Sequence, residues 1–204
     1  MATMLGFIAT DAVIPASMLD GMLRTAVNLS FNRITVDGDT STNDAVTLSA
    51  TGQSDFVVSP TAPEEALAFQ AALNELAIAL AQDIIRDGEG ATKFVEIEVL
   101  DARSVDEADR VARTIAHSPL VKTALFASDP NWGRILAAVG RAGVEDLDVD
   151  TVSLSLNGVL IAEKGARARN YTEQAGVAAM APEDLLISVN LARGNQAATI
   201  WTTD

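Results

Sequence analysis

The sequence predicts a mixed α/β fold in which helices and strands pack in layers. Its 204 residues suffice for one large domain, or for two small lobes that share a core. Apolar residues make up 49% of the chain and aromatic residues only 4%, so Ala, Val, Leu and Ile must build most of the core. Segments with helical and with strand periodicity both recur along the chain. We therefore expect one compact unit over residues 1–204.

Four segments carry helix signals. Residues 19–31 predict a short helix, and residues 62–86 a long one. The long helix should bury one apolar stripe, formed by Phe69, Leu73, Leu76, Leu80 and Ile84. Ser104 and Glu107 are typical caps of a third helix, which should stop before Pro119. Asp129 at the N-cap and Pro130 in the first turn predict a fourth helix.

Strand signals occur near both ends of the chain. Short apolar or alternating runs bounded by turn residues are typical of strands. The expected strands are 5–9, 45–50, 93–101, 151–157, 158–163, 184–192 and 196–202. Residues 120–127 form another apolar run, which we also expect to be extended.

Charge and cysteine content exclude several classes of function. With 28 acidic and 14 basic residues the net charge is -14, which disfavours nucleic acid and anionic membranes as partners. The chain has no cysteine, which excludes disulfides, thiolate zinc sites and a cysteine nucleophile. Neither a signal peptide nor an apolar run long enough for a membrane span is present, so we expect a soluble, cytoplasmic protein without a metal.

A hydroxyl nucleophile is the remaining route to covalent chemistry, and it needs a base. The single histidine, His117, lies in the last turn of a predicted helix, where a partial positive charge would complement the helix dipole. A G-x-S-x-G motif is absent. An N-terminal threonine can use its own α-amine as the base. Thr3 could act in this way once Met1 and Ala2 have been removed.

A second candidate lies in the stretch RDGEGATK, just after the long helix. Asp87 and Glu89 would face the negative end of the helix dipole, and such local conflicts are enriched at functional sites. A helix-ending Gly88 flanked by solvated acids explains the same pattern. The spacing of a phosphate-binding loop is absent. From the residues alone, both interpretations of Glu89 stay open.

Two further motifs are less specific. DGDTSTND begins like a calcium loop with Asp37, Asp39 and Ser41, but Thr42 replaces the turn glycine and Leu48 the bidentate glutamate. We therefore do not expect calcium to bind, and the small polar side chains of the loop would instead satisfy backbone groups. In DPNWGR, Arg134 should lie in the first turn of a helix, where a cation needs an anionic partner. A structural salt bridge is the simplest expectation.

Six motifs, in order and in register, resemble the β chain of ornithine acetyltransferase (bifunctional glutamate N-acetyltransferase, the ArgJ family). They are MATMLGF, DGDTSTND, DGEGATK, SPLVKTA, DPNWGR and WTTD. The resemblance extends from Met1 to Asp204. It implies an α+β fold, a layered α/β sandwich of the DmpA/ArgJ-like type.

The resemblance also implies a mechanism. The precursor would cut itself between Ala2 and Thr3, and Thr3 would carry the acetyl group from N-acetyl-L-ornithine to L-glutamate in arginine biosynthesis. Glu89 matches the substrate-binding glutamate of the family, and a carboxylate suits the α-ammonium group of an amino acid. No cofactor is implied, although some members accept acetyl-CoA as the donor. The implied partner is the α chain of the same precursor, in a heterotetramer of two α and two β chains.

The sequence departs from the family pattern in several places. The family's Thr-Gly oxyanion hole and substrate-binding lysine belong to the upstream chain, and an Asn with a Ser or Thr follows the TTD motif, so we expect this chain alone to lack part of the site. Met1 and Ala2 precede Thr3, and His117 stands where members commonly carry Asn. Two alternatives stay open: a self-processing aminopeptidase or amidase, in which water resolves the acyl-enzyme, and an inactive isolated subunit.

Overall fold

The computed structural model describes residues 4–204, and these residues form two compact units. The N-terminal unit comprises the described residues up to Ile34 together with Asp39–Ile84. The C-terminal unit comprises Thr35–Gly38 together with Ile85–Asp204. The short segment Thr35–Gly38 therefore leaves the N-terminal unit and joins the C-terminal one.

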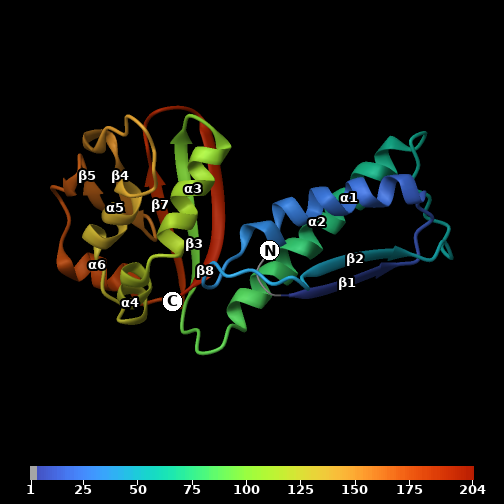
Figure 1. The fold of residues 1–204 in the computed structure, drawn as a ribbon, viewed down its shortest axis with the longest axis horizontal. Helices are drawn as coiled ribbons and strands as arrows, with labels where there is room; N and C mark the ends of the chain where they lie inside the picture. Colours follow the sequence, from blue (N-terminus) through green and yellow to red (C-terminus); the bar gives the residue numbers. More distant parts are fainter. Residues whose placement is uncertain (1–3) are drawn as a thin grey trace. The chain divides into compact units, whose positions relative to one another are not determined.

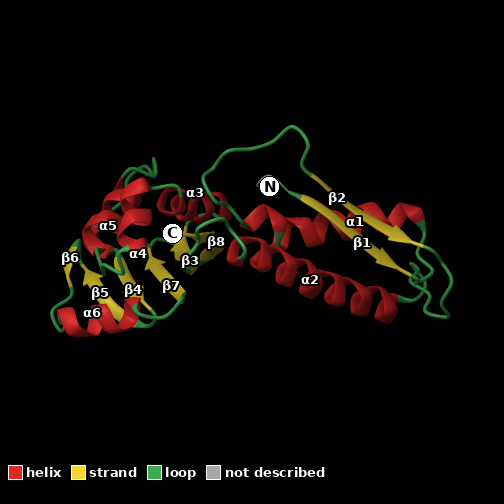
Figure 2. Ribbon diagram, turned by 90° about the horizontal axis from the view of Figure 1, so that it is seen from below, coloured by secondary structure: helices red, strands yellow, loops and turns green. Residues whose placement is uncertain are grey.

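The N-terminal unit is built on a parallel pair of strands. β1 (Leu5–Thr10) pairs in parallel with β2 (Ala45–Ala50), and both predicted strands are confirmed. The helix α1 (Ala16–Leu29) and the long helix α2 (Pro63–Arg86) run alongside these strands, and a 3-10 turn, η1 (Phe31–Arg33), follows α1 (Figures 1 and 2). Both helices are confirmed, although α1 begins three residues before the expected start.

The buried stripe of α2 differs from the expected one. Leu73 is buried as predicted, but Leu76 is 47% exposed and Leu80 is 38% exposed. The buried positions instead follow i, i+4 spacing through Leu73, Ala77, Ala81 and Ile85. The prediction was wrong because it weighted the large side chains, whereas alanines allow a helix to approach its neighbours closely.

The C-terminal unit holds a mixed sheet of six strands in the order β6-β5-β4-β7-β3-β8. β3 pairs parallel with β7 and antiparallel with β8, and the other pairs are antiparallel. The bounds are β3 Phe94–Ala102, β4 Ser153–Leu156, β5 Val159–Glu163, β6 Ala166–Arg167, β7 Asp184–Asn190 and β8 Gln196–Thr203. All of these except the two-residue β6 fall on predicted strands.

Helices α3 (Val105–Ala116) and α5 (Trp132–Gly140) cover one face of this sheet (Figures 1 and 2). Their apolar sides pack with Val95, Ile97 and Val99 of β3 in one buried cluster. Burying this aliphatic surface is the main favourable contribution to the stability of the unit. The α3 cap is confirmed, because Ser104 Oγ accepts a hydrogen bond from Glu107 N at 3.1 Å.

Three local predictions need correction. Residues 120–127, expected to be extended, lie in the helix α4 (Pro119–Phe126), in which Pro119 takes the first position, where proline is favoured. The N-cap of α5 is Asn131, whose Oδ1 accepts from Arg134 N at 3.2 Å. Asp129 and Pro130, expected at the N-cap and in the first turn, therefore both precede the helix, and Asp129 instead accepts from Asn131 Nδ2. The helix α6 (Glu173–Met180), capped by Thr172, and the 3-10 turn η2 (Val149–Thr151) were not predicted.

No helix within residues 4–204 combines the length and the apolar character that crossing a bilayer would require.

Candidate active site

The candidate site lies in the C-terminal unit, where β3 begins and β8 ends. The antiparallel register places Phe94 beside Thr203, so the motifs DGEGATK and WTTD become neighbours. Asp204 Oδ1 accepts the backbone N–H groups of Thr92 at 2.8 Å and of Lys93 at 3.0 Å. Thr203 Oγ1 donates to the carbonyl of Lys93 at 2.9 Å. Two motifs about a hundred residues apart are thereby joined through their polar groups.

Glu89 lies on the turn between α2 and β3. Ala91 N donates to the carbonyl of Gly88 at 3.0 Å, and Gly90 has a φ of 75°, which a glycine adopts without strain. The Glu89 side chain is exposed and makes no hydrogen bond or ion pair with any of residues 4–204. Its carboxylate is therefore available to a ligand, as either sequence interpretation would allow.

The segment Thr35–Gly38 adds the start of DGDTSTND to this region. Thr35 N donates to the carbonyl of Trp201 at 3.0 Å, and Thr35 Oγ1 lies 2.8 Å from His117 Nε2. Gly38 has a φ of 90°, and a Cβ at this position would come within 3.1 Å of the imidazole of His117. Glycine is favoured here, because the backbone conformation strains other residues and a Cβ would make a tight contact with the imidazole.

His117 caps the C-terminus of α3, as its position at a helix end predicted. The surroundings of the ring, however, disfavour the partial positive charge expected there. Burial, together with the charges of Arg113 and Lys122, lowers the pKa of His117, and the opposing effect of Asp37 is smaller. The desolvated ring therefore favours its neutral form, and it acts as a hydrogen-bond partner of Thr35.

Lys122, on α4, brings the motif SPLVKTA to the same end of the sheet. Its Nζ donates to the carbonyl of Thr203 at 2.5 Å and lies 3.5 Å from Thr202 Oγ1. Burial lowers the pKa of Lys122, while the carboxylates of Asp204 and Asp37 act in the opposite direction. Neither Lys122 nor Asp204 was singled out from the sequence, although each lies within a motif that carried the resemblance.

Arg134 of DPNWGR supports this arrangement without an ion pair. Its Nη1 donates to the carbonyl of Leu120 at 2.9 Å and to Thr123 Oγ1 at 3.0 Å. The expected salt bridge is wrong, because within the described residues both partners of Arg134 are neutral groups of α4. Arg134 thus connects α5 to the helix that carries Lys122.

Thr3 and Ala2, the predicted nucleophile and cleavage site, lie outside the described residues. The backbone N of the next residue, Met4, donates to Asp44 Oδ1 at 3.0 Å, and its carbonyl accepts from Ala45 N at 3.3 Å. Asp44 is the last residue of DGDTSTND, so this motif reaches the beginning of β1. Its hydroxyl-rich part bonds locally, with Ser41 Oγ accepting from Asn43 N at 3.1 Å.

A polar pocket of about 400 Å³ adjoins the Glu89 turn. It is lined by Arg86, Ala91, Thr92, Lys93, Phe94, Glu183 and Asp184. Arg86 closes one side through two hydrogen bonds to the carboxylate of Asp184, and its guanidinium lies 3.9 Å from the centroid of the Phe94 ring. In residues 4–204, no group of three or more acidic or histidine side chains is arranged to hold a metal ion.

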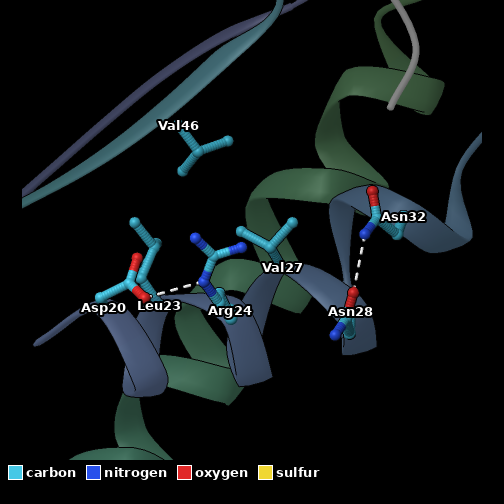
Figure 3. A pocket seen from close by; sticks show the side chains of 7 residues that line it. All are labelled: Asp20, Leu23, Arg24, Val27, Asn28, Asn32 and Val46. Carbon is cyan, nitrogen blue, oxygen red and sulfur yellow. Dashed lines mark hydrogen bonds and ion pairs between the residues drawn. The ribbon is translucent and has the colours of Figure 1, made fainter. Parts of the chain in front are cut away.

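A second pocket, of about 310 Å³, lies in the N-terminal unit between α1 and Val46 of β2 (Figure 3). Asp20 and Arg24 form an exposed ion pair at 2.8 Å on its wall, and Asn32 donates to Asn28 at 2.8 Å. Glu89, the one predicted site residue within residues 4–204, does not line this pocket. Its polar side chains bond to one another on the surface of α1 and η1, so the pocket offers little specific chemistry.

Comparisons with known proteins agree with this geometry. The model of the ArgJ family matches residues 1–204. Two proteins named "Arginine biosynthesis bifunctional protein ArgJ" are similar over the whole chain: the one from Pseudomonas syringae pv. tomato is 55% identical and the one from Methylococcus capsulatus 54% identical. The chain covers 51% and 50% of these proteins, so it spans about half the length of the curated relatives it matches.

A crystal structure of the ArgJ protein from Bacillus halodurans has the same fold, with a TM-score of 0.90 and 40% sequence identity. The similarity covers 99% of this chain and 94% of that one. The layered α+β arrangement and the convergence of the motifs thus define a chain of the ArgJ-like class. The chain belongs to the ArgJ family.

Proposed function

We propose that this chain is the nucleophile-bearing β chain of an acetyltransferase that moves an acetyl group from N-acetyl-L-ornithine to L-glutamate. The observation that carries the proposal is the match of the ArgJ family model to all 204 residues. The relatives' printed name assigns them to arginine biosynthesis and calls them bifunctional. The meeting of DGEGATK, SPLVKTA and WTTD at one end of a sheet supports the same conclusion.

In the proposed reaction Thr3 Oγ attacks the acetyl carbonyl carbon of N-acetylornithine while the α-amine of Thr3 takes the hydroxyl proton. The amide C–N bond breaks, ornithine leaves with that proton, and an acetyl-Thr3 ester remains. The amine of glutamate then attacks the ester, and the proton it loses returns to Thr3 Oγ as the C–O bond breaks. The transfer needs no cofactor or metal, and acetyl-CoA is a second donor to be tested.

The proposal requires a free amine on Thr3, which we infer arises by self-cleavage between Ala2 and Thr3. The hydrogen bonds of Asp44 and Ala45 to Met4 support Thr3 as the nucleophile, because they fix the backbone immediately after it. Positioning a nucleophile in this way accelerates the reaction by reducing the entropy lost in reaching the transition state.

Glu89 is proposed to bind the ammonium group of the amino-acid substrate. Its exposed carboxylate lies on a turn held by backbone bonds, beside a polar pocket. An ammonium group and a carboxylate form a charge-assisted hydrogen bond, which is stronger than a neutral one.

The proposed partner is an upstream α chain from the same precursor, in a heterotetramer of two α and two β chains. Within residues 4–204, β1 and β2 form a sheet of two parallel strands, on which Phe7 is 79% exposed. Parallel sheets are almost always covered on both faces and contain more strands, so this sheet needs further protein to complete it. The α chain would also supply the donors that stabilise the oxyanion. We keep the cytoplasmic location expected from the sequence, which cell fractionation would test.

The test is to co-express this chain with its upstream half and to record the intact mass of the β chain. We expect a chain that begins at Thr3, gains one acetyl group from N-acetylornithine and loses it when glutamate is added. Thr3→Ala should abolish the adduct, and acetyl-CoA can replace N-acetylornithine as the donor in a parallel reaction. If the acetyl group is lost equally fast with and without glutamate, the enzyme is an amidase. If no adduct forms, Thr3 is not the nucleophile.

A further inference from the structure

One carboxylate holds the C-terminal side of the Glu89 turn. Asp204 Oδ1 accepts from the backbone N–H groups of Thr92 at 2.8 Å and of Lys93 at 3.0 Å, and Asp204 Oδ2 accepts from the hydroxyl of Thr92. Two successive backbone donors and one hydroxyl of the same segment therefore converge on one side chain. Such charge-assisted hydrogen bonds are roughly twice as strong as neutral ones.

The other side of the turn is fixed by its own backbone. Gly88 N donates to the carbonyl of Ile85 at 3.3 Å, and Ala91 N donates to the carbonyl of Gly88 at 3.0 Å. Glu89 thus lies between the end of α2 and the residues held by Asp204. Because Glu89 has no partner of its own among residues 4–204, the location of its carboxylate depends on these two attachments.

The charge of Asp204 is maintained by its surroundings. Burial acts to raise the pKa of Asp204, but the hydrogen bonds from Thr92, Lys93 and Thr203 outweigh it, and the pKa lies below its usual value. The ammonium group of Lys122, bound to the carbonyl of Thr203, adds a cation nearby. The acceptor therefore stays ionised at neutral pH.

We propose that Asp204 is a positioning residue that holds the Glu89 turn, residues 88–92, and thereby fixes where the Glu89 carboxylate meets the ammonium group of an amino-acid substrate. This inference rests on the proposed function, in which Glu89 binds that group. Asp204 itself does not contact substrate. Without Asp204, the amides of Thr92 and Lys93 lose their acceptor, and Glu89 is no longer held in the orientation that binds best.

The first experiment is a double-mutant cycle on the KM for glutamate, measured in the assembled complex with the upstream chain. Asp204→Ala and Glu89→Gln should each raise KM by about tenfold, the scale expected when one charge-assisted hydrogen bond is lost. Their effect on kcat should be smaller, because binding rather than chemistry is impaired. If Asp204 acts through Glu89, the double variant should be little worse than Glu89→Gln alone.

Two further variants separate positioning from stability. Asp204→Asn keeps Oδ1 for the backbone donors, so it should preserve most of the affinity for glutamate. Asp101→Ala serves as the matched control at the opposite end of β3. There Asp101 Oδ2 accepts a hydrogen bond from Asn190 Nδ2 at 2.5 Å. The backbone of Asp101 has a φ of 53°, which strains an alanine. It should lower stability without raising KM.

Hydrogen exchange on the same complex provides a readout that is independent of activity. Asp204→Ala should accelerate exchange of the amides of Thr92 and Lys93, whereas Glu89→Gln should leave them unchanged. Fully additive effects on KM, or an unchanged KM in Asp204→Ala when Glu89→Gln raises it, would overturn the positioning role. An unchanged KM in Glu89→Gln would instead refute the role of Glu89 in the proposed function.

Discussion

The backbone N–H of Met4 donates to the carboxylate of Asp44 at 3.0 Å, and this bond ties the start of β1 to the residue before β2. Met4 follows the proposed nucleophile directly, and Asp44 ends the motif DGDTSTND. The strands pair from Leu5 with Ala45 onward, so the bond extends the ladder by one residue. A motif with the beginnings of a calcium loop thus serves to hold the chain after Thr3.

Replacing Asp44 should slow the first half-reaction. We expect Asp44→Ala to reduce the rate of acetyl-Thr3 formation by about tenfold, the lower end of the scale for one hydrogen bond to a charged group. Asp44→Asn keeps an oxygen acceptor and should be less impaired. Time-resolved intact mass of the β chain measures the rate. Ser41→Ala removes only the local bond to Asn43 and is the control; an equal loss of rate in Ser41→Ala would argue against a specific role for Asp44.

The buried imidazole of His117 should make stability depend on pH. Burial, with Arg113 and Lys122, lowers the pKa of His117 in the folded chain, so the unfolded chain binds more protons near pH 6. The free energy of unfolding contributed by His117 is therefore fully present above the unfolded pKa of 6.5 and decreases as the pH falls from 6.5 towards the folded pKa.

Urea unfolding of the wild type and of His117→Asn at pH 5.5 and 7.5 measures this contribution. The variant should lose less stability on acidification, because asparagine does not titrate while its amide can still bond to Thr35. A wild type and variant with parallel pH dependence would show that the ring is protonated in the folded chain as readily as in the unfolded one.

Replacing an alanine of α2 by a larger residue should lower the free energy of unfolding only on the buried side of the helix. Ala77 is fully buried, so Ala77→Leu should lower the free energy of unfolding by about 1–3 kcal/mol through overpacking. Ala79 is exposed on the same helix, and Ala79→Leu should change stability by less than about 0.5 kcal/mol. Urea denaturation compares the two. Equal costs at both positions would mean that the buried stripe is assigned incorrectly.

A buried ion pair should make the start of α3 sensitive to charge removal. Arg193 Nε lies 3.1 Å from Glu107 Oε1, and the side chains are only 9% and 10% exposed. Glu107→Ala should destabilise the chain by about 3–5 kcal/mol, because it leaves the guanidinium buried without its anion. The exposed neighbour Asp106 is the control, and Asp106→Ala should cost less than about 1 kcal/mol. Thermal unfolding measures both variants, and equal losses of stability in Glu107→Ala and Asp106→Ala would contradict this account.

Regular elements with a strong local period were predictable. The long helix α2 and the strands β2 and β3 lie within one residue of their expected bounds. The helix α3 begins directly after its predicted cap and ends before Pro119 as expected. The short apolar run at 120–127 was mistaken for a strand because eight residues carry too little periodicity to distinguish a strand from a buried helix. The helix α6 has only eight residues, with Gly176 near its middle and Val177 and Met180 as its larger apolar side chains, so its pattern was too weak to detect.

The candidate site was predictable only in part. Glu89 was identified from its conflict with the helix dipole and from the family resemblance, and the structure places it exposed on a turn. Lys122 and Asp204 were missed because each resembles an ordinary surface residue in its local sequence. Their importance lies in partners about 80 and 111 positions away, which no local pattern can reveal.

The sequence by itself determined the periodic elements, the absence of a cysteine nucleophile and, through six ordered motifs, the expected family. Those properties depend on neighbouring residues or on composition, so they can be read without knowing the fold. Only the tertiary structure decided that Asp204 binds Thr92 and Lys93, that α2 buries Ala77 and Ala81 rather than Leu76 and Leu80, and that His117 favours its neutral form. Each of these depends on strand register and on burial by distant segments, which follow from packing of the whole chain rather than from any local stretch of it.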